Sequence, residues 1–410
     1  MAKVFFRTYG CTLNQADSEA MQAMLQHELA SNEEEADVVV VNTCAVKGPT
    51  EDKIVHYLNE LKKKGKKFVI AGCLTANKPL VSRYGVPVIS TTAISHINEA
   101  VKDALEGKQS FYYQLEKKEN LPLSFTPPIG KIPIQEGCFS SCHFCFTKLA
   151  RRYQSRTPGQ IIRWIKQALM EGCKEIDLTG TDIGTYGKDV GSNLVELLEL
   201  ITQIEGDFRV RIGMGSPHYY KQMLEGLLRV YDSPKIYKFF HLSIQSGSEK
   251  VVREMNRSHT VQDWIDVLKA FREKYGKRFT AATDIIVGYP TETEEDFEQT
   301  LRFLERWRPD VVNLSKFTPR PFTEAAKLRQ LPSEVIKKRS FIVHELLKEI
   351  NYKNNELHLG ESYRVLVTEP KKARTDFYRQ VVLDKDVPLG SFVEVEIYDV
   401  SHTSLFGKVK

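Results

Sequence analysis

The alternation of apolar runs with helical patterns limits the fold more than any other feature of this sequence. In the first 119 residues, three short apolar runs read as buried strands, and each ends at a cysteine. Segments with helical apolar spacing lie between them. Alternating strands and helices predict an open parallel sheet that is covered by helices. The strands are expected at residues 3–11, 36–44 and 66–73, and the helices at 15–29 and 49–65.

The same alternation resumes after a proline-rich segment at residues 120–131, which we interpret as a linker. Six strand–helix units follow it. Six units suit a partial (β/α)6 barrel, because a complete barrel of this type needs eight. The six strands are expected at 132–138, 174–180, 209–214, 238–244, 280–288 and 311–317.

The pattern changes once more near Gly360, after a long polar helix at about 333–357. Short alternating segments without helices follow, separated by turn residues, and they predict a small all-β barrel. The expected fold class is therefore α/β with an all-β tail. We expect four parts: an open parallel α/β sheet domain at 1–119, the linker at 120–131, a partial barrel at 132–359 and the small barrel at 360–410.

The composition is typical of a folded globular protein. Hydrophobic residues make up 41% and charged residues 27% of the 410 residues. No apolar run reaches the roughly 18 residues that a membrane span needs, and the N-terminus lacks the features of a signal peptide. Seven cysteines are an odd number, which argues against a disulfide framework. We expect a cytoplasmic protein without membrane contact, whose net charge of +5 permits an anionic partner such as nucleic acid.

Three cysteines are spaced as in a metal site with one open position. Cys138, Cys142 and Cys145 have C-x3-C-x2-C spacing directly after the first expected barrel strand. Structural zinc takes four protein ligands and would need His143 or a distant residue here. A cubane iron–sulfur cluster takes four thiolates, so three of them leave one iron open to a substrate or cofactor. The spacing favours the open cluster, with His143 as a spacer in the loop.

Three further cysteines end consecutive strands of the N-terminal domain. Cys11, Cys44 and Cys73 should meet at the carboxyl edge of the sheet, where open α/β sheets bind their ligands. A single buried cysteine is often only a small apolar residue, as we expect of Cys173. Three at one edge are hard to explain by packing, and they favour a second metal site.

The segment from about residue 132 to 317 resembles the radical S-adenosylmethionine enzymes, on the cysteine motif and the strand series that follows it. The resemblance implies a 4Fe-4S cluster whose open iron is chelated by S-adenosylmethionine. In that family an aromatic residue commonly precedes the last cysteine, as Phe144 does here. By position, the further cofactor contacts would be Gly180, Thr181, Asp182, Ser243, Gln245 and Gly288.

The outer parts of the chain narrow the resemblance. The blocks YGCTLNQADSE, VNTCAVKGPTE and IAGCL are similar to the N-terminal domain of the methylthiotransferases, whose three cysteines hold a second open 4Fe-4S cluster. The tail resembles the TRAM domain, an RNA-binding barrel. YGCTLNQADSE is most similar to the archaeal and eukaryotic branch. That branch adds a methylthio group to carbon 2 of N6-threonylcarbamoyladenosine, beside the tRNA anticodon.

The resemblance implies two half-reactions and a set of partners. One S-adenosylmethionine methylates a sulfur on the cluster of Cys11, Cys44 and Cys73, and a second, at the other cluster, yields a 5′-deoxyadenosyl radical. The radical removes the hydrogen at adenine carbon 2, where the methylated sulfur then attaches. The implied partners are a tRNA anticodon stem-loop and a low-potential electron donor such as a flavodoxin or ferredoxin. We expect the protein to act as a monomer.

Two groups of cations are candidates for contacts with RNA. The first expected hairpin of the tail interleaves basic and aromatic residues, as nucleic-acid surfaces do, although an ordinary solvated turn explains it equally well. Cations after the cysteine motif would contact phosphates. We interpret His241 as a residue that lines the barrel. The cations and aromatic residues concerned are Lys371, Lys372, Arg374, Phe377, Tyr378 and Arg379 in the hairpin, and Lys148, Arg151, Arg152 and Arg156 after the motif.

Other functions stay open at this point. The same chemistry acts on isopentenyladenosine in tRNA in one related branch, and on an aspartate of a ribosomal protein in another. A protein of a different class, a non-catalytic iron–sulfur or zinc RNA-binding protein, would use the tail as its working part. The two three-cysteine sets, each with an open position, argue against that last reading.

Overall fold

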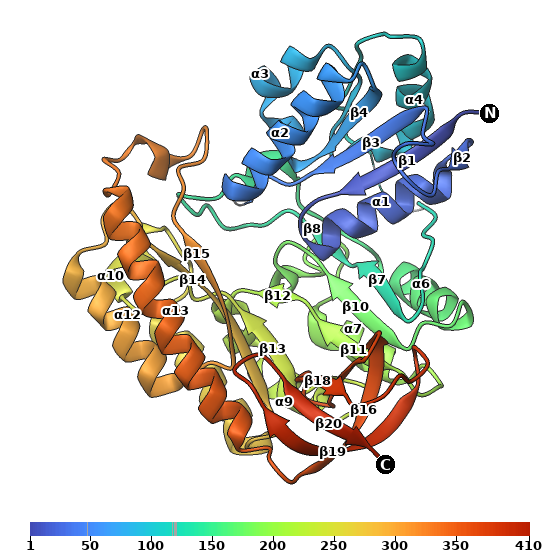
Figure 1. Cartoon of the computed structure of the whole chain (residues 1–410). Coiled ribbons are helices and arrows are strands. Elements are labelled where there is room, and N and C mark those ends of the chain that lie inside the picture. The colour runs from blue at the N-terminus through green and yellow to red at the C-terminus, as the bar shows by residue number, and fades with distance from the viewer. Residues whose placement is uncertain (47, 117, 119–120) are drawn as a thin grey trace.

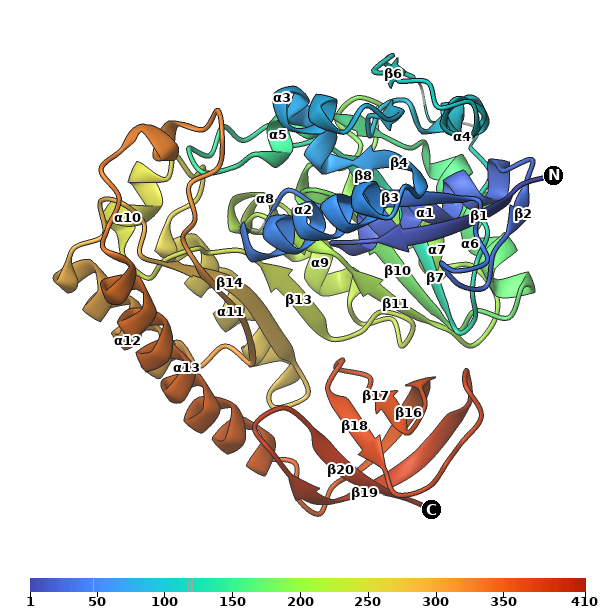
Figure 2. The same ribbon diagram turned by 45° about the horizontal axis from the view of Figure 1, so that its top comes forward.

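The computed structural model describes residues 1–46, 48–116, 118 and 121–410. The chain forms three units: a sheet domain, a partial barrel and a small closed barrel (Figure 1). They follow one another from the top of the view to the bottom, and the long helix α13 runs down one side. The sheet domain and the small barrel therefore lie on opposite sides of the partial barrel (Figure 2).

The N-terminal sheet has six parallel strands in the order β2-β1-β3-β4-β5-β6. Val38 and Val40 pack with α1 and α4 on one face, while Val39 and Val41 pack with α2 on the other, because successive strand side chains alternate between faces. The expected helix-covered parallel sheet is confirmed. Its elements are β1 (Lys3–Thr8), α1 (Thr12–Met24), β2 (Glu28–Leu29), β3 (Val38–Thr43), α2 (Gly48–Lys63), β4 (Lys67–Gly72), η1 (Cys73–Ala76), α3 (Lys78–Val81), η2 (Ser82–Tyr84), β5 (Val88–Ile89), η3 (Ile94–His96), α4 (Ile97–Leu105) and β6 (Phe111–Tyr112).

The central unit is the expected partial barrel of parallel strands. The strands form two sheets, β11-β10-β7 and β12-β13-β14-β15. The third expected strand is broken into β11 and β12 at Gly213, where a Cβ atom would lie 2.6 Å from the carbonyl oxygen of Leu178. The first strand begins at Ile129, inside the segment interpreted as a linker. The strands are β7 (Ile129–Pro133), β10 (Glu175–Thr179), β11 (Arg209–Ile212), β12 (Met214–Gly215), β13 (Phe239–Leu242), β14 (Thr280–Val287) and β15 (Val311–Lys316).

Helices cover the outside of this barrel and bury the apolar faces of its strands. Threonine side chains cap several of them: Thr260 and Thr293 each form a capping box with the aspartate three residues further on. The helices and minor elements are β8 (Gln135–Glu136), α5 (Thr147–Ala150), β9 (Gln154–Ser155), α6 (Pro158–Met170), η5 (Ile183–Thr185), α7 (Leu194–Thr202), α8 (Pro217–Gln222), α9 (Leu224–Val230), α10 (Glu249–Glu254), α11 (Val261–Tyr275), α12 (Glu294–Trp307), η6 (Glu324–Lys327) and α13 (Ser333–Glu356).

The C-terminal unit is a closed barrel with the strand order β16-β17-β18-β20-β19. The expected all-β barrel is confirmed. The sequence did not reveal β17, because this strand has only three residues and two of them are basic. The strands are β16 (Ser362–Glu369), β17 (Lys372–Arg374), β18 (Gln380–Leu383), β19 (Phe392–Val400) and β20 (Leu405–Val409).

The turn between β17 and β18 docks against the beginnings of the barrel strands. The Tyr378 ring packs at 4.9 Å from Tyr237 and 4.7 Å from Phe239, measured between ring centroids. Arg379 donates a hydrogen bond to Asp310 (2.5 Å), and Phe377 is fully buried. The prediction that these three hairpin residues face RNA is therefore wrong. Tyr378 covers aromatic surface at the base of the partial barrel, Arg379 pairs with a buried carboxylate there, and Phe377 lies in the core of the C-terminal barrel. Of the same hairpin, Lys371 and Lys372 keep exposed side chains.

Within the described ranges, no helix combines the length and the apolar character that crossing a membrane requires.

Candidate cofactor site

The loop that carries Cys138, Cys142 and Cys145 begins where β8 ends, and all three side chains are partly exposed. Its entry depends on Gly137, which has φ +75° and whose added Cβ atom would lie 2.3 Å from the backbone nitrogen of Tyr153. Only glycine fits there. The Gly137 N–H donates to Thr181 Oγ1 (3.1 Å), which ties the loop to the next strand end.

The far side of the loop is held by the end of α10. His143 donates its backbone N–H to the carbonyl of Met255 (3.0 Å), and its ring Nδ1 lies 2.9 Å from the carbonyl of Glu254. The ring is thus engaged with the backbone. Asn256, in the left-handed region with φ +55°, donates to the carbonyl of Ser141 (2.9 Å).

Arg257 is a site residue that the sequence analysis missed. Its Nη1 donates to Cys142 Sγ (3.2 Å), and its Nη2 donates to the carbonyl of Ser243 (3.1 Å). A guanidinium beside a thiolate stabilises the charged form of the ligand. Nothing in the sequence marks this arginine, because its partner lies 115 residues away.

Burial and neighbouring charges raise the pKa of two thiols of this loop. Burial raises the pKa of Cys138 to about 11, with smaller contributions from the nearby Asp182 and from Cys142. Burial also raises the pKa of Cys145, again with a contribution from Cys142. The three thiols are thus near enough to influence one another. A metal that binds them has to displace their protons.

The LTGTD turn lies beside this loop, as its predicted cofactor role requires. An added Cβ atom at Gly180 would lie 2.8 Å from both the backbone and the side-chain oxygen of Gln135. The same side-chain oxygen accepts hydrogen bonds from the backbone N–H groups of Thr181 (3.1 Å) and Asp182 (3.2 Å). Asp182 in turn lies 3.7 Å from Cys138 Sγ. The turn is therefore fixed next to the first cysteine.

The other predicted cofactor residues differ in their surroundings. Gln245 has φ +75°, a strained conformation for a residue with a side chain and one that is enriched at functional sites. Ser243 donates its hydroxyl to Asp284. Gly288 has a packing reason to be glycine, since its Cβ would lie 2.6 Å from Ile336 of α13. Phe144 packs against a small apolar cluster that includes Tyr289. The cofactor roles of these residues stay predictions.

The second set of cysteines lies at the carboxyl edge of the N-terminal sheet, where β1, β3 and β4 end. Gly10 (φ +105°) lets the chain pass Cys44, whose Sγ would lie 2.9 Å from an added Cβ atom. Burial raises the pKa of Cys73 to about 12, an effect that the charge of Arg151 opposes and that the other two thiols, Cys11 and Cys44, support. Asn14 donates hydrogen bonds to the carbonyls of Tyr9 (2.9 Å) and Thr43 (2.8 Å), which fixes two of the cysteine loops together.

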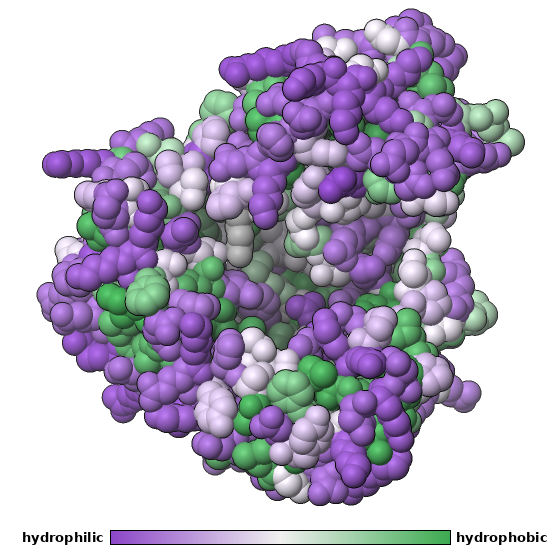
Figure 3. Space-filling view, viewed as in Figure 1, coloured by the Kyte–Doolittle hydropathy of each residue, from purple (hydrophilic) through white to green (hydrophobic). Residues whose placement is uncertain are grey.

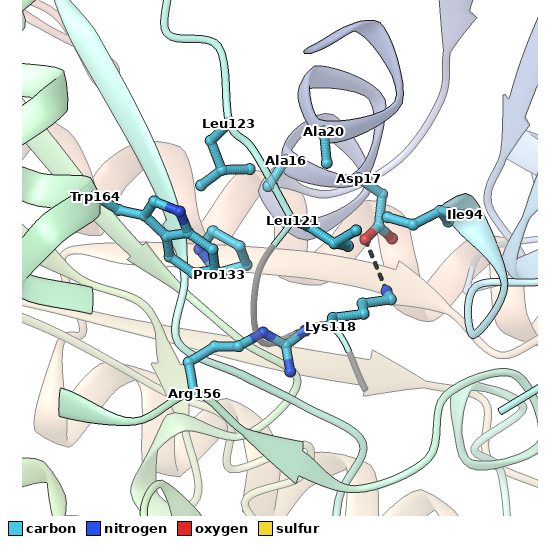
Figure 4. A pocket seen from close by; sticks show the side chains of 10 residues that line it. All are labelled: Ala16, Asp17, Ala20, Ile94, Lys118, Leu121, Leu123, Pro133, Arg156 and Trp164. Carbon is cyan, nitrogen blue, oxygen red and sulfur yellow. Dashed lines mark hydrogen bonds and ion pairs between the residues drawn. The ribbon is translucent and has the colours of Figure 1, made fainter. Parts of the chain in front are cut away.

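A buried network of ions connects the N-terminal domain to the barrel. Figure 4 shows three of its members, Asp17, Lys118 and Arg156. Lys118 lies 3.1 Å from both Asp17 and Glu136. Arg151 contacts the same two carboxylates, at 2.5 Å and 3.0 Å, and Arg156 contacts Glu136 at 2.8 Å. Each of these side chains is at most 7% exposed. The network is close to both cysteine sets: the charge of Arg151 acts on the pKa of Cys73, and Glu136 is two residues before Cys138.

The network corrects one prediction. Arg151 and Arg156 do not contact phosphates, because both are buried in ion pairs. Lys148 and Arg152, on the same stretch, are exposed. Sequence reasoning could not separate the two pairs, since the acidic partner on α1 lies 134 residues from Arg151.

The network also carries one more cation than it has carboxylates. Arg156 has two buried nitrogen atoms, Nε and Nη1, without a hydrogen-bond partner. A small cavity of about 10 Å³ lies beside Arg156, Lys118 and Trp164, about the size that one water molecule needs. A surplus of buried positive charge close to both thiol sets suits a negatively charged group nearby.

The donor sets fit iron–sulfur clusters with an open position. In the part of the chain that the structure describes, no three His, Cys, Asp or Glu side chains converge closely enough to hold a single metal ion. A cubane cluster is larger than one ion, and each of its thiolates binds a different iron. Three thiols in each set, and glycines that keep side chains out of the loops, match that larger group.

The fold and the site define the chain as a radical S-adenosylmethionine enzyme. Residues 132–304 match the radical SAM superfamily. The fold is similar to that of TsrM, a radical S-adenosylmethionine methyltransferase from Kitasatospora setae (TM-score 0.56, 12% identity, 80% of this chain and 75% of the other). OxsB, a cobalamin-dependent radical enzyme, is also similar (TM-score 0.53, 11% identity, 85% and 56%). S-adenosylmethionine and an iron–sulfur cluster are thus its cofactors.

The chain belongs to the threonylcarbamoyladenosine tRNA methylthiotransferase family. The probable enzyme of this name from Pyrococcus horikoshii is 39% identical over the full length of both chains. The human enzyme is 34% identical, over 97% of this chain and 72% of its own. Residues 3–84 match the uncharacterized protein family UPF0004, and residues 356–410 match the TRAM domain. The resemblance stated from the sequence motifs is confirmed.

Proposed function

We propose that this enzyme adds a methylthio group to carbon 2 of N6-threonylcarbamoyladenosine, next to the anticodon of tRNA. The observation that carries the proposal is the pair of three-cysteine sets, each at the carboxyl edge of its own parallel sheet and joined by the buried ion network. Relatives from archaea and animals that bear this activity in their names align with nearly the whole chain, which supports the same substrate.

Each cysteine set would hold one 4Fe-4S cluster, so that the protein carries two. Cys138, Cys142 and Cys145 would leave one iron open to S-adenosylmethionine, and Cys11, Cys44 and Cys73 would hold the second cluster. When bound, these cofactors supply the radical, methyl and sulfur chemistry that protein side chains lack. The adenine C–H bond has no acidic proton that a side chain could remove, which explains why the enzyme needs them.

The protein's own residues position these groups. Arg257 holds Cys142 and places positive charge beside its sulfur. Arg151 and Lys118 each contact one carboxylate from the N-terminal domain and one from the barrel, so they fix the two cysteine sets relative to each other. Rigid spacing matters because a radical reaction depends on how closely the reacting atoms are held.

We propose that an exposed aromatic platform beside the cysteine loop stacks on bases of the RNA. Phe139, between the first two cysteines, is 51% exposed, and its ring lies 4.0 Å from that of Tyr153. The Lys188 ammonium lies 5.3 Å from the Phe139 ring and 4.3 Å from the Tyr219 ring. Aromatic rings with interleaved cations bind single-stranded bases. The TRAM domain, with its exposed Lys371 and Lys372, adds a second RNA surface.

The remaining parts of the proposal concern organisation. We propose a division into a methylthiotransferase domain at 1–119, a linker at 120–131, the radical barrel at 132–359 and the RNA-binding barrel at 360–410. The last three residues of this linker already belong to the barrel strand β7. The protein would act as a monomer in the cytoplasm on an anticodon stem-loop. A low-potential flavodoxin or ferredoxin would supply the electrons.

The decisive experiment is mass spectrometry of nucleosides from tRNA of cells with and without the gene. The expected result is a methylthio increment on threonylcarbamoyladenosine that requires the gene and is lost in the Cys142→Ala variant. The matched control is Cys173→Ala, because Cys173 is buried and belongs to neither set. A methylthio increment on isopentenyladenosine instead would show that this nucleoside is the substrate. If no tRNA nucleoside changes in mass, the proposed substrate is wrong, and the remaining candidates are a ribosomal protein target and a non-catalytic binding role.

A further inference from the structure

A layer of polar side chains lines the inner face of the barrel on β13, β14 and β15. The Asp284 carboxylate is its centre. Asp284 Oδ2 accepts hydrogen bonds from His241 Nε2 (2.9 Å) and from the Ser243 hydroxyl, and Oδ1 accepts one from Asn313 Nδ2 (3.0 Å). The donors come from two neighbouring strands, one on each side of β14. We refer to His241, Asp284 and Asn313 as the polar layer.

The polar layer faces open space. The intervening residues of β14, such as Ile285 and Val287, are fully buried in the core, so the layer lies on the opposite face of the sheet. The side chains of His241 and Asp284 are 13% and 22% exposed, and Asn313 is exposed. Figure 3 shows that the molecule is hollowed between the N-terminal domain, α13 and the C-terminal barrel. Interiors of such barrels are usually filled by branched apolar residues, so a polar layer here needs another reason.

Along the direction of the strands, the polar layer lies between the base of the barrel, where the C-terminal barrel docks, and the cysteine loop. Phe239, His241 and Ser243 are alternate residues, so they point to the same face about 7 Å apart. Phe239 packs on Tyr378 and forms part of this base. The carbonyl of Ser243 accepts from Arg257, which also contacts Cys142. The polar layer therefore lies between Phe239 at the base of the barrel and the residues that hold the cysteine loop.

The polar layer retains hydrogen-bonding capacity on its open side. The Asp284 contacts use Nε2 of His241 and one amide N–H of Asn313. Asn313 Nδ2 also lies 3.4 Å from His241 Nε2, which cannot accept a hydrogen bond while its own N–H points to Asp284. Imidazole Nδ1 and the amide oxygen with its second N–H therefore remain for a ligand. Asp284 holds both groups in fixed orientations, and together they offer donors and acceptors side by side. A substituent with a ureido group and a hydroxyl matches this set, whereas an alkenyl chain would leave it unpaired.

We propose that the polar layer binds the N6-threonylcarbamoyl substituent of the target adenine and selects it over an apolar isopentenyl substituent. The proposal rests on the proposed function and deepens it, because it assigns substrate selection to named residues. Desolvating hydrogen-bonding groups without a partner is costly, so the apolar competitor is disfavoured by the groups it fails to satisfy.

The test uses Asn313→Leu, a change of similar size at an exposed position. Anticodon stem-loops that carry threonylcarbamoyladenosine or isopentenyladenosine are compared in binding and in turnover by the full-length enzyme reconstituted with iron and sulfide. We expect wild type to favour the first by about ten- to hundredfold, and the variant to lose most of this preference. Iron content and the affinity for S-adenosylmethionine should not change. The control is Gln203→Leu, at an exposed position at the end of α7.

The outcomes separate the two proposals. If wild type modifies only the isopentenyl loop, the proposed function fails, and this inference fails with it. If wild type prefers the threonylcarbamoyl loop and Asn313→Leu keeps that preference, only the inference is overturned. A second variant, His241→Leu, is needed because His241 could still bind the substituent when Asn313 is replaced. Retained preference in both variants excludes the polar layer as the selecting element.

Discussion

Removing the charge of Glu136 should destabilise the junction between the N-terminal domain and the barrel more than any surface charge change. Glu136 is 4% exposed and contacts Lys118, Arg151 and Arg156. In the variant Glu136→Gln these three cations would keep only Asp17 as a carboxylate partner. Breaking a buried ion pair by removing one partner costs about 3–5 kcal/mol, because a charge is left uncompensated.

The pKa of this carboxyl gives an independent magnitude. Burial alone would raise it, but Lys118, Arg156 and Arg151 outweigh burial and lower the pKa of Glu136 from 4.5 to about 2. At 1.36 kcal/mol for each pH unit, this difference corresponds to about 3 kcal/mol of folding free energy at neutral pH. Both routes give the same order, so we expect the free energy of unfolding to fall by about 3 kcal/mol.

The pH dependence follows from the direction of the change. A carboxyl with a lowered pKa stabilises the folded state fully above its unfolded value of about 4.5, and this stabilisation is lost as the pH falls towards 2. Glutamine does not titrate. The stability gap between wild type and variant should therefore be largest at pH 7 and about 1 kcal/mol smaller at pH 4.

Urea unfolding followed by tryptophan fluorescence measures this effect, because Trp164 lies beside the network. The control is Glu34→Gln, at an exposed position, which should change stability by no more than about 0.5 kcal/mol. A loss below about 1 kcal/mol for Glu136→Gln, or a gap that does not change with pH, would refute the view that this carboxylate neutralises the buried cations.

Three further outcomes test the site. Cys73→Ala should remove about four of roughly eight bound iron atoms in an iron assay, whereas Cys173→Ala should retain all of them. Arg257→Gln should keep its iron but lower the reduction potential of the bound cluster by roughly 60 mV, measured by redox titration, because Cys142 loses a charged donor; an unchanged potential would exclude this contact. Phe139→Ala should weaken binding of an anticodon stem-loop about 5- to 100-fold at unchanged thermal stability, and undiminished affinity would rule out stacking there.

The sequence was sufficient for the elements and the ligand types. Strands β3 and β4 are continuous apolar runs that end at cysteines, so their type and their common edge followed from local pattern alone. Cys138, Cys142 and Cys145 lie within eight residues of one another. Their role as ligands of an open cluster could therefore be predicted from one loop. Strand β17 was not predicted, because a strand of three residues is too short to show an alternating pattern.

Contacts between distant residues could not be predicted in the same way. Arg151, Arg156 and Arg379 look like surface cations in sequence, yet each finds a buried carboxylate partner, and two of these partners lie on other units of the fold. The contact of Arg257 with Cys142 could not be predicted for the same reason. The sequence around a charged side chain does not indicate its partner. Whether the side chain is buried depends on which surfaces the fold brings together.

The sequence by itself determined the order of the three units, the parallel sheets and the two sets of three thiols, because periodicity and ligand spacing are properties of neighbouring residues. Only the tertiary structure decided which cations remain free for RNA, how the two thiol sets are joined and which side chains line the hollow of the barrel. Those properties depend on the packing of segments that are distant in sequence, where the solvation of each charge is set by the whole fold.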